Sequence, residues 1–171
     1  MVQKLPRSLS LEEFTKIILR TPKKRFKLAF GLGFFSGLRV SEVVKLKPED
    51  IDFKRRTILI KESKGGKDRI VPLPKNMPIS YFKLLPFRYK NVKSGSRSLQ
   101  ITFMKYLRAA KLDKKGISFH SLRHSFATRA LQQGMPINQV QLLMGHTNLS
   151  TTSIYLKANP FEAINKYEEI F

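Results

Sequence analysis

The sequence predicts an α+β fold, a mainly helical single domain with a small three-stranded antiparallel sheet. Its 171 residues, 42% of them hydrophobic, are enough for one domain with a full core and too few for two large ones. Apolar residues recur at helical spacing along most of the chain. Residues 51–74 differ, because short β-branched runs flank a Gly-Gly pair there, the pattern of strands joined by a hairpin.

Three helices are predicted in the N-terminal part of the chain. Ser10 and Glu13 have the spacing of a capping box, so the first helix should begin there and end before Pro22. Residues 23–37 carry too many apolar positions for a half-exposed helix and predict a central, largely buried one. A short helix should follow over residues 40–46.

The three predicted strands come next along the chain. They are IDF (51–53), TILIKES (57–63) and RIVPLP (69–74), with KGGK (64–67) as the hairpin turn between the last two. The four prolines between residues 72 and 95 predict a short helix and a loop rather than a long element.

Helices are expected over most of the C-terminal half. Gly134 should cap one of them, and Pro136 should open the next. The predicted helical segments are 99–110, 119–133, 136–145, 148–157 and 161–171.

The charge of the chain predicts a polyanionic partner. Lysine and arginine number 33 against 12 acidic residues, a formal charge of +21 that is spread along the whole length. The absence of cysteine excludes a disulfide framework, a thiolate zinc site and a cysteine nucleophile. No apolar run approaches the roughly 20 residues of a membrane span, and the first residues lack the apolar segment of a signal peptide. We therefore expect a cytoplasmic, DNA-associated protein.

Two arginines and a histidine are candidates for binding a phosphate. His120 and Arg123 are three residues apart in a predicted helix and should project from one face, where both can bind an anion. By itself this pair is a weak signal, since a buried, hydrogen-bonded histidine is the commoner explanation for either His120 or His124. Arg39 directly follows the most apolar helix, where a solitary arginine is costly to bury without an anionic partner.

Other basic and hydroxylated residues are candidates for contacts with DNA. The predicted hairpin presents Lys64 and Lys67 on a projecting turn, and for Lys67 we favour contact with backbone phosphates. Arg69 at the end of this hairpin is a further candidate for DNA binding. Thr151 and Thr152 lie in a run of small hydroxylated residues that can cap a helix or hydrogen-bond a phosphate.

One of the five tyrosines has surroundings suited to a nucleophile. Tyr106 and Tyr167 lie on apolar faces of predicted helices, where packing explains them, and Tyr81 and Tyr89 fall in the proline-rich segment. Tyr155 alone has small, polar neighbours that would let a phosphate reach its hydroxyl.

Four segments in fixed order carry a resemblance to a known family. They are GLRVSE (37–42), SKGGKDRIVPL (63–73), HSLRHSFAT (120–128) and LLMGHTNLSTTSIY (142–155). Together they resemble the tyrosine recombinases, the phage integrases and Xer-type resolvases, over nearly the whole chain. Four ordered motifs are a much more specific signal than any one of them.

The resemblance implies a reaction and a role for each motif residue. It implies cleavage and rejoining of DNA strands through a 3′-phosphotyrosyl link, without ATP, metal or cofactor. The catalytic residues that it implies are Arg39 and Arg123 as the phosphate clamp, Lys64 as general acid, His120 as general base, His146 as a hydrogen-bond donor and Tyr155 as the nucleophile. These roles suit the side chains, because a free lysine is charged at neutral pH and a free tyrosine still holds its proton.

Two other functions are compatible with parts of the sequence. A helix-turn-helix regulator would account for residues 137–155 but leaves Arg39, Lys64 and the His120–Arg123 pair unexplained. A type IB topoisomerase shares the tyrosine chemistry, and active-site residues alone do not separate strand religation from strand exchange.

The resemblance also implies how the chain is organised. We expect residues 1–171 to form the catalytic domain, without the N-terminal core-binding domain that the family usually carries. Residues 161–171 have an apolar stripe that could pack on their own domain or dock into a neighbouring protomer on DNA.

Overall fold

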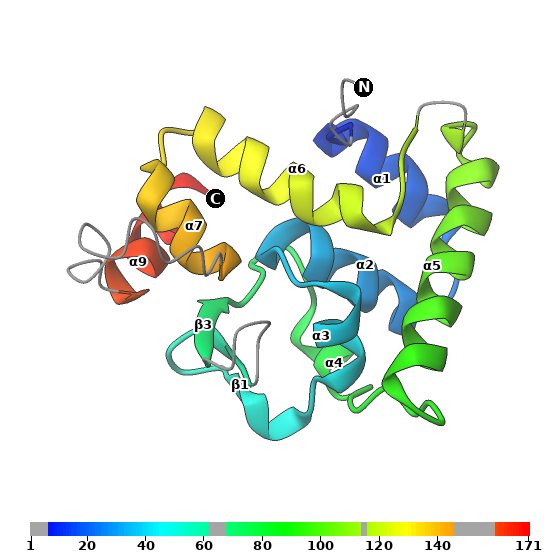
Figure 1. Ribbon diagram of the computed structural model, residues 1–171, viewed down its shortest axis with the longest axis horizontal. Coiled ribbons are helices and arrows are strands. Elements are labelled where there is room, and N and C mark those ends of the chain that lie inside the picture. Colours follow the sequence, from blue (N-terminus) through cyan, green and yellow to red (C-terminus); the bar gives the residue numbers. More distant parts are fainter. Residues whose placement is uncertain (1–6, 62–67, 114–115, 146–159) are drawn as a thin grey trace.

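The computed structural model describes residues 7–61, 68–113, 116–145 and 160–171 (Figure 1). Its strands are β1 (Ile51–Asp52), β2 (Thr57–Ile60) and β3 (Arg69–Pro72). Its helices are α1 (Leu11–Arg20), α2 (Lys24–Ser36), α3 (Val40–Lys45), the 3-10 helix η1 (Pro48–Asp50), α4 (Ile79–Phe82), α5 (Val92–Ala109), α6 (Phe119–Gln132), α7 (Ile137–Met144) and α9 (Pro160–Ile170). The predicted fold class, mainly helical with one small antiparallel sheet, is confirmed.

Helix α2 is the central helix of the domain, as predicted. Every residue from Leu28 to Ser36 is buried, with α6 packed along one side of it and α5 close by (Figure 1). Aromatic rings fill the contacts: Phe30 meets Phe103 of α5 edge to face at 5.2 Å, and Phe34 stacks on Phe14 of α1 at 4.0 Å. This apolar packing fixes both ends of α2, including the end from which the chain enters α3.

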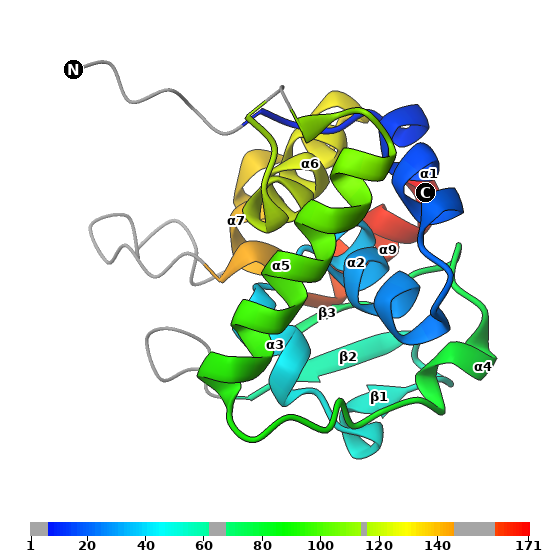
Figure 2. The same ribbon diagram turned by 90° about the vertical axis from the view of Figure 1, so that its right-hand side faces the viewer.

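The sheet lies at the lower edge of the molecule in Figures 1 and 2, with the strand order β1-β2-β3. Both pairings are antiparallel, and β2 pairs with β3 in the register Ile58 to Val71 and Ile60 to Arg69. Ile58 and Val71 are fully buried. The strands are shorter than predicted, and Arg69 is the first residue of β3.

Helix α5 begins seven residues before the apolar face that predicted it. Asn91 caps it by accepting a hydrogen bond from the Ser94 backbone N–H at 2.8 Å. Gly95 lies in the first turns, where an added Cβ would come within 2.7 Å of Val44 in α3. The glycine allows α5 to pack closely against α3, the short helix that carries part of the candidate site.

Helix α9 packs against α7 and β3 of its own chain. Its buried residues Ala163, Ile164 and Tyr167 join Phe126 and Leu143 in a second apolar cluster. Burial raises the pKa of the Tyr167 hydroxyl, in keeping with the packing role predicted for this tyrosine. Residues 161–171 could pack on their own domain or dock into a neighbouring protomer, and in this structure α9 packs on its own domain. No helix in the described part of the chain is both long and apolar enough to cross a membrane.

Truncating the apolar face of α9 should therefore destabilise the domain. Ile164→Ala removes a side chain that is only 4% exposed, and we expect it to lower the free energy of unfolding by about 3 kcal/mol. Urea denaturation at neutral pH measures the change, with Glu162→Ala on the exposed face of α9 as the control. Unchanged stability in Ile164→Ala would favour the alternative in which α9 docks onto a neighbouring protomer.

Candidate active site

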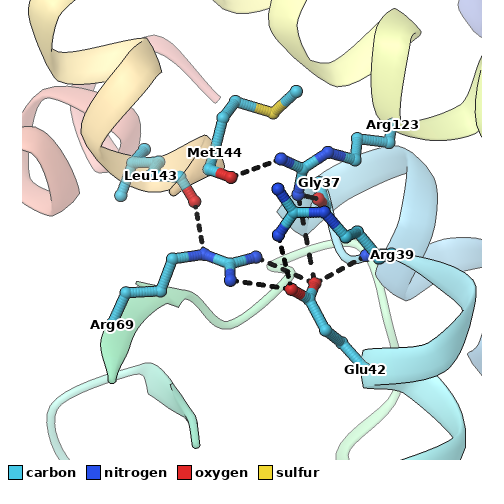
Figure 3. A network of polar contacts seen from close by, with 7 residues as sticks. All are labelled: Gly37, Arg39, Glu42, Arg69, Arg123, Leu143 and Met144. Atoms are coloured by element: carbon cyan, nitrogen blue, oxygen red, sulfur yellow. Dashed lines mark hydrogen bonds and ion pairs between the residues drawn. The ribbon is translucent and has the colours of Figure 1, made fainter. Parts of the chain in front are cut away.

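The carboxylate of Glu42 lies at the centre of a cluster of three arginines from three different elements (Figure 3). Arg39 immediately precedes α3, and Glu42 lies in its first turn. The Glu42 Oε2 accepts from the Arg39 backbone N–H at 2.7 Å, and Oε1 accepts from Arg39 Nη1 at 2.8 Å. The same carboxylate thus caps the helix and holds the first of the two predicted clamp arginines.

Arg69 approaches the cluster from β3. Its Nη1 and Nη2 donate to the two oxygens of Glu42 at 2.8 and 2.9 Å, a bidentate pair. Its Nε donates to the carbonyl of Leu143, in the last turn of α7, at 2.9 Å. The sequence predicted a DNA contact for Arg69, but the structure gives it protein partners on both sides and leaves 7% of its side chain exposed.

Arg123 reaches the cluster from α6. Its Nη1 donates to the carbonyl of Gly37 at 2.6 Å and lies 4.0 Å from Glu42 Oε2, while its Nη2 donates to the carbonyl of Met144. The predicted pair of clamp arginines is therefore brought together on one carboxylate, although Arg39 and Arg123 are far apart in the sequence. Figure 3 shows both guanidinium groups on the same side of Glu42.

The turn between α2 and α3 needs a glycine at position 37. Gly37 ends α2 with a left-handed φ of +68°, and a Cβ there would lie 2.6 Å from a ring carbon of Phe126. Only glycine satisfies both conditions without strain. The turn directs the Gly37 carbonyl to Arg123 and places Arg39 at the start of α3, which is the structural reason for the GLR sequence.

The cluster carries more positive than negative charge. Three guanidinium groups surround one carboxylate, so the four side chains together have a charge of 3 − 1 = +2. Burial alone would raise the pKa of Glu42, but hydrogen bonds and charge from Arg69, with hydrogen bonds from Arg39, outweigh it and lower that pKa to about 2. Burial, followed by repulsion from Arg39 and Arg69, lowers the pKa of Arg123 to about 9, so it stays charged at neutral pH.

The open side of the cluster is the one formed by Arg39. Its side chain is 25% exposed, against 11% for Arg123 and 7% for Arg69, and no described residue other than Glu42 hydrogen-bonds to its guanidinium. Of the three arginines, Arg39 is therefore the most accessible to an anion. The arrangement is chemically suited to one singly charged, tetrahedral ester such as a DNA backbone phosphate.

Of the other predicted catalytic residues, the structure describes His120 alone. His120 is exposed in the first turn of α6, three residues before the buried Arg123. Lys64, His146 and Tyr155 lie outside the described residues. Among the predicted DNA contacts, Lys67, Thr151 and Thr152 also lie outside them. No described group of three or more His, Asp and Glu side chains could hold a metal ion.

Glu42 is the residue of the site that sequence reasoning missed. A signal was present, because Arg39 directly precedes the helix predicted over 40–46 and Glu42 lies three residues after it, a spacing at which side chains meet. The cost of burying Arg39 also requires an anionic partner. In the structure, Glu42 is an anionic partner of Arg39.

The motifs and the geometry agree with comparisons to known proteins. The model of the phage integrase family matches residues 8–162. This chain belongs to the phage integrase family. The resemblance predicted from the sequence motifs is thereby confirmed. The family match covers nearly the whole chain, whereas a helix-turn-helix regulator would account for residues 137–155 alone.

Two curated tyrosine recombinases are similar to this integrase family member. Tyrosine recombinase XerA of Thermococcus onnurineus is 38% identical over an alignment of 182 residues, covering 96% of this chain and 62% of that protein. A tyrosine recombinase of Pseudothermotoga lettingae is 38% identical over 177 residues, covering 96% of this chain and 62% of that protein. The chain thus spans less than two thirds of the length of these relatives.

Solved structures of tyrosine recombinases share the fold. An integrase from mycobacterium phage Brujita has a TM-score of 0.78 at 26% identity, covering 100% of this chain and 60% of its own. A crystal structure of XerA recombinase has a TM-score of 0.69 at 26% identity, covering 97% and 65%. A pre-cleavage complex of XerH recombinase bound to difH substrate has a TM-score of 0.68 at 28% identity, covering 99% and 55%.

Proposed function

We propose that residues 1–171 are the catalytic domain of a site-specific DNA recombinase that cleaves and rejoins strands through a 3′-phosphotyrosyl intermediate. The observation that supports this most strongly is the pair of Arg39, hydrogen-bonded to Glu42, and Arg123, whose Nη1 lies 4.0 Å from the same carboxylate, in a cluster with a surplus of positive charge. Family membership and the order of the four sequence motifs support the same function.

The two arginines would act on the phosphate at the cleavage point. Attack on a phosphodiester concentrates negative charge on the non-bridging oxygens, and fixed guanidinium groups stabilise that charge more than they stabilise the ground state. Arg123 is held rigidly by two backbone carbonyls, so little reorganisation accompanies the reaction. The guanidinium groups supply the cationic charge at the phosphate.

The remaining predicted residues would make the new bond to phosphorus, transfer the protons and donate a hydrogen bond to the phosphate. The hydroxyl oxygen of Tyr155 attacks phosphorus, and the bond from phosphorus to the 5′-oxygen breaks. The phenolic proton passes to His120, and Lys64 gives a proton to the departing 5′-oxygen, which leaves as a 5′-hydroxyl. His146 donates a hydrogen bond to a non-bridging oxygen. A 5′-hydroxyl from another strand then reverses these steps, and no ATP is needed because one phosphoester replaces another.

Double-stranded DNA is the proposed partner. The formal charge of +21 suits a phosphate backbone, and the XerH relative has been crystallised with its difH substrate. Self-association on the DNA and a cytoplasmic location are part of the same proposal. Self-association through residues 161–171 would require α9 to exchange its own apolar cluster for a neighbour's.

Trapping the covalent intermediate tests the proposed reaction. We would incubate the protein with a pool of nicked duplexes of randomised sequence, in which the short 5′-hydroxyl fragment diffuses away after cleavage and cannot religate. Wild type should give a protein–DNA band on a denaturing gel, and Tyr155→Phe should give none, because it lacks the attacking oxygen. Tyr81→Phe, which keeps Tyr155, is the control and should match wild type.

The outcomes of this experiment are distinct. An adduct of equal yield in Tyr155→Phe would show that another residue is the nucleophile. The absence of any adduct in wild type, at concentrations where the duplex is bound, would contradict the proposed reaction itself. Duplexes recovered from the wild-type adduct then serve as the selected substrate for the rate measurements described below.

A further inference from the structure

Arg69 is a buried arginine that connects the clamp to another part of the fold. It begins β3, and three of its five N–H groups donate to residues that the structure describes, two to Glu42 and one to the carbonyl of Leu143. The guanidinium therefore lies between the start of α3 and the end of α7, and Figure 3 shows it bridging the two.

On the clamp side, Arg69 and Arg39 share the two oxygens of Glu42. Oε1 accepts from Nη1 of both arginines, and Oε2 accepts from Arg69 Nη2 and the Arg39 backbone N–H. The bidentate pair fixes the plane of the carboxylate. Without Arg69, the Glu42 side chain could rotate and would no longer hold the Arg39 guanidinium in one position.

On the other side, Arg69 fixes the end of α7. The carbonyl of Leu143 accepts from Arg69 Nε, and the next carbonyl, of Met144, accepts from Arg123. Two arginines thus hydrogen-bond to backbone carbonyls in the last turn of α7, where carbonyls lack partners within the helix. Gly145 follows with a φ of +62°, and a Cβ on it would lie 2.9 Å from Arg69 Cδ.

Burial argues against the direct contact with DNA that the sequence suggested for Arg69. Its side chain is 7% exposed, and its partners lie inside the protein on both sides. Arg39, by contrast, is 25% exposed, and among the described residues its guanidinium donates to Glu42 alone. An effect of Arg69 on the reaction must therefore pass through the residues that it holds.

We propose that Arg69 is a positioning residue for strand cleavage, which holds the Arg39–Arg123 clamp and the C-terminal end of α7 in one fixed relation. This role rests on the proposed function. The hydrogen bonds of Arg69 join the Glu42 carboxylate to the end of α7. In the sequence, α7 is followed by His146 and Tyr155. A displacement of about 1 Å between reacting groups can cost on the order of a hundredfold in rate, so such a link matters.

Two substitutions at Arg69 separate positioning from binding. Arg69→Met keeps the length of the side chain and removes all three hydrogen bonds. Arg69→Lys keeps a cation beside Glu42, but its single nitrogen cannot replace a bidentate guanidinium and the Leu143 bond together. Arg55→Met is the control, since it removes the same charge at an exposed site. Arg55 lies between β1 and β2, and its side chain is 71% exposed.

We would measure the duplex dissociation constant by fluorescence anisotropy and the single-turnover rate of adduct formation at saturating protein. Arg69→Met should bind the selected duplex within about twofold of wild type and form adduct at least about tenfold more slowly. Arg69→Lys should regain part of the rate. Arg55→Met should react at the wild-type rate. Circular dichroism melting establishes that each variant is folded at the assay temperature.

The other outcomes overturn the positioning role. A wild-type rate in Arg69→Met, or in Arg69→Lys if the Met variant does not fold, would show that the link is not needed. A loss of affinity equal to the loss of rate would show that Arg69 contacts DNA. A Lys variant as slow as a folded Met variant would indicate a structural role only. These results leave the proposed function standing if wild type forms the adduct, whereas a wild type without adduct overturns both.

Discussion

Arg123→Lys is expected to slow covalent cleavage by on the order of a hundredfold, corresponding to about 3 kcal/mol of transition-state stabilisation. The guanidinium of Arg123 donates to the carbonyls of Gly37 and Met144 and still has N–H groups for a phosphate. A lysine has a single nitrogen on a flexible stem. It cannot donate to both carbonyls and also present further N–H groups to a phosphate in the planar arrangement of a guanidinium.

The single-turnover rate of adduct formation on the selected duplex measures this effect. Arg108→Lys is the matched control, because Arg108 is exposed on α5 and the substitution conserves charge in the same way. We expect the control to react at the wild-type rate. A rate for Arg123→Lys within about twofold of wild type would show that a point charge is sufficient and that the planar geometry has no catalytic role.

Glu42→Ala should be the most destabilising single substitution in the site. It leaves three arginines facing one another without their carboxylate, and removing one partner of a buried ion pair costs about 3–5 kcal/mol. Glu42→Gln keeps the shape of the side chain but loses the charge, so we expect a loss toward the lower end of that range. The domain should unfold at correspondingly lower urea concentrations at pH 7.

The stability that comes from the Glu42 charge should also depend on pH. The pKa of Glu42 is about 2 in the folded protein, below the value of about 4.5 for an unperturbed carboxyl, so ionised Glu42 stabilises the folded state. This contribution is complete above about pH 4.5 and is lost as the pH falls toward 2. The difference in unfolding free energy between wild type and Glu42→Gln should therefore shrink over this window.

Urea denaturation of both proteins between pH 7 and the acid limit of folding measures that difference. Glu169→Gln, at a side chain that is 66% exposed, is the control and should give a small, nearly constant difference. A difference between wild type and Glu42→Gln that stays constant from pH 7 to pH 3 would contradict the coupling of Glu42 to the arginines.

Much of the fold could be predicted because its signals are local. The capping box at Ser10, the apolar run of α2 and the left-handed Gly134 after α6 each depend on a few neighbouring residues. The start of α5 was missed because its first turns are polar and are fixed by the Asn91 cap and by the packing of Gly95 on α3.

The candidate site was predictable to the extent that its residues belong to recurring motifs. Arg39 and Arg123 were predicted as a pair, and the structure places both on Glu42. The role of Arg69 was not predicted, because it depends on β3 meeting α3 and α7. Glu42 was missed although its spacing from Arg39 is a local signal. A sequence shows that a buried arginine needs an anion, but only the fold shows whether the protein or the substrate provides it.

The most direct test of the arginine clamp changes the charge of the substrate instead of the protein. In a duplex with a methylphosphonate at the cleavage point, a neutral methyl group replaces one charged non-bridging oxygen. Arg39→Ala should lose on the order of a hundredfold in cleavage rate on the normal duplex and less than about tenfold on the methylphosphonate duplex, because less charge needs stabilising. Equal losses on the two duplexes would contradict the claim that these guanidinium groups act on the negative charge of the phosphate.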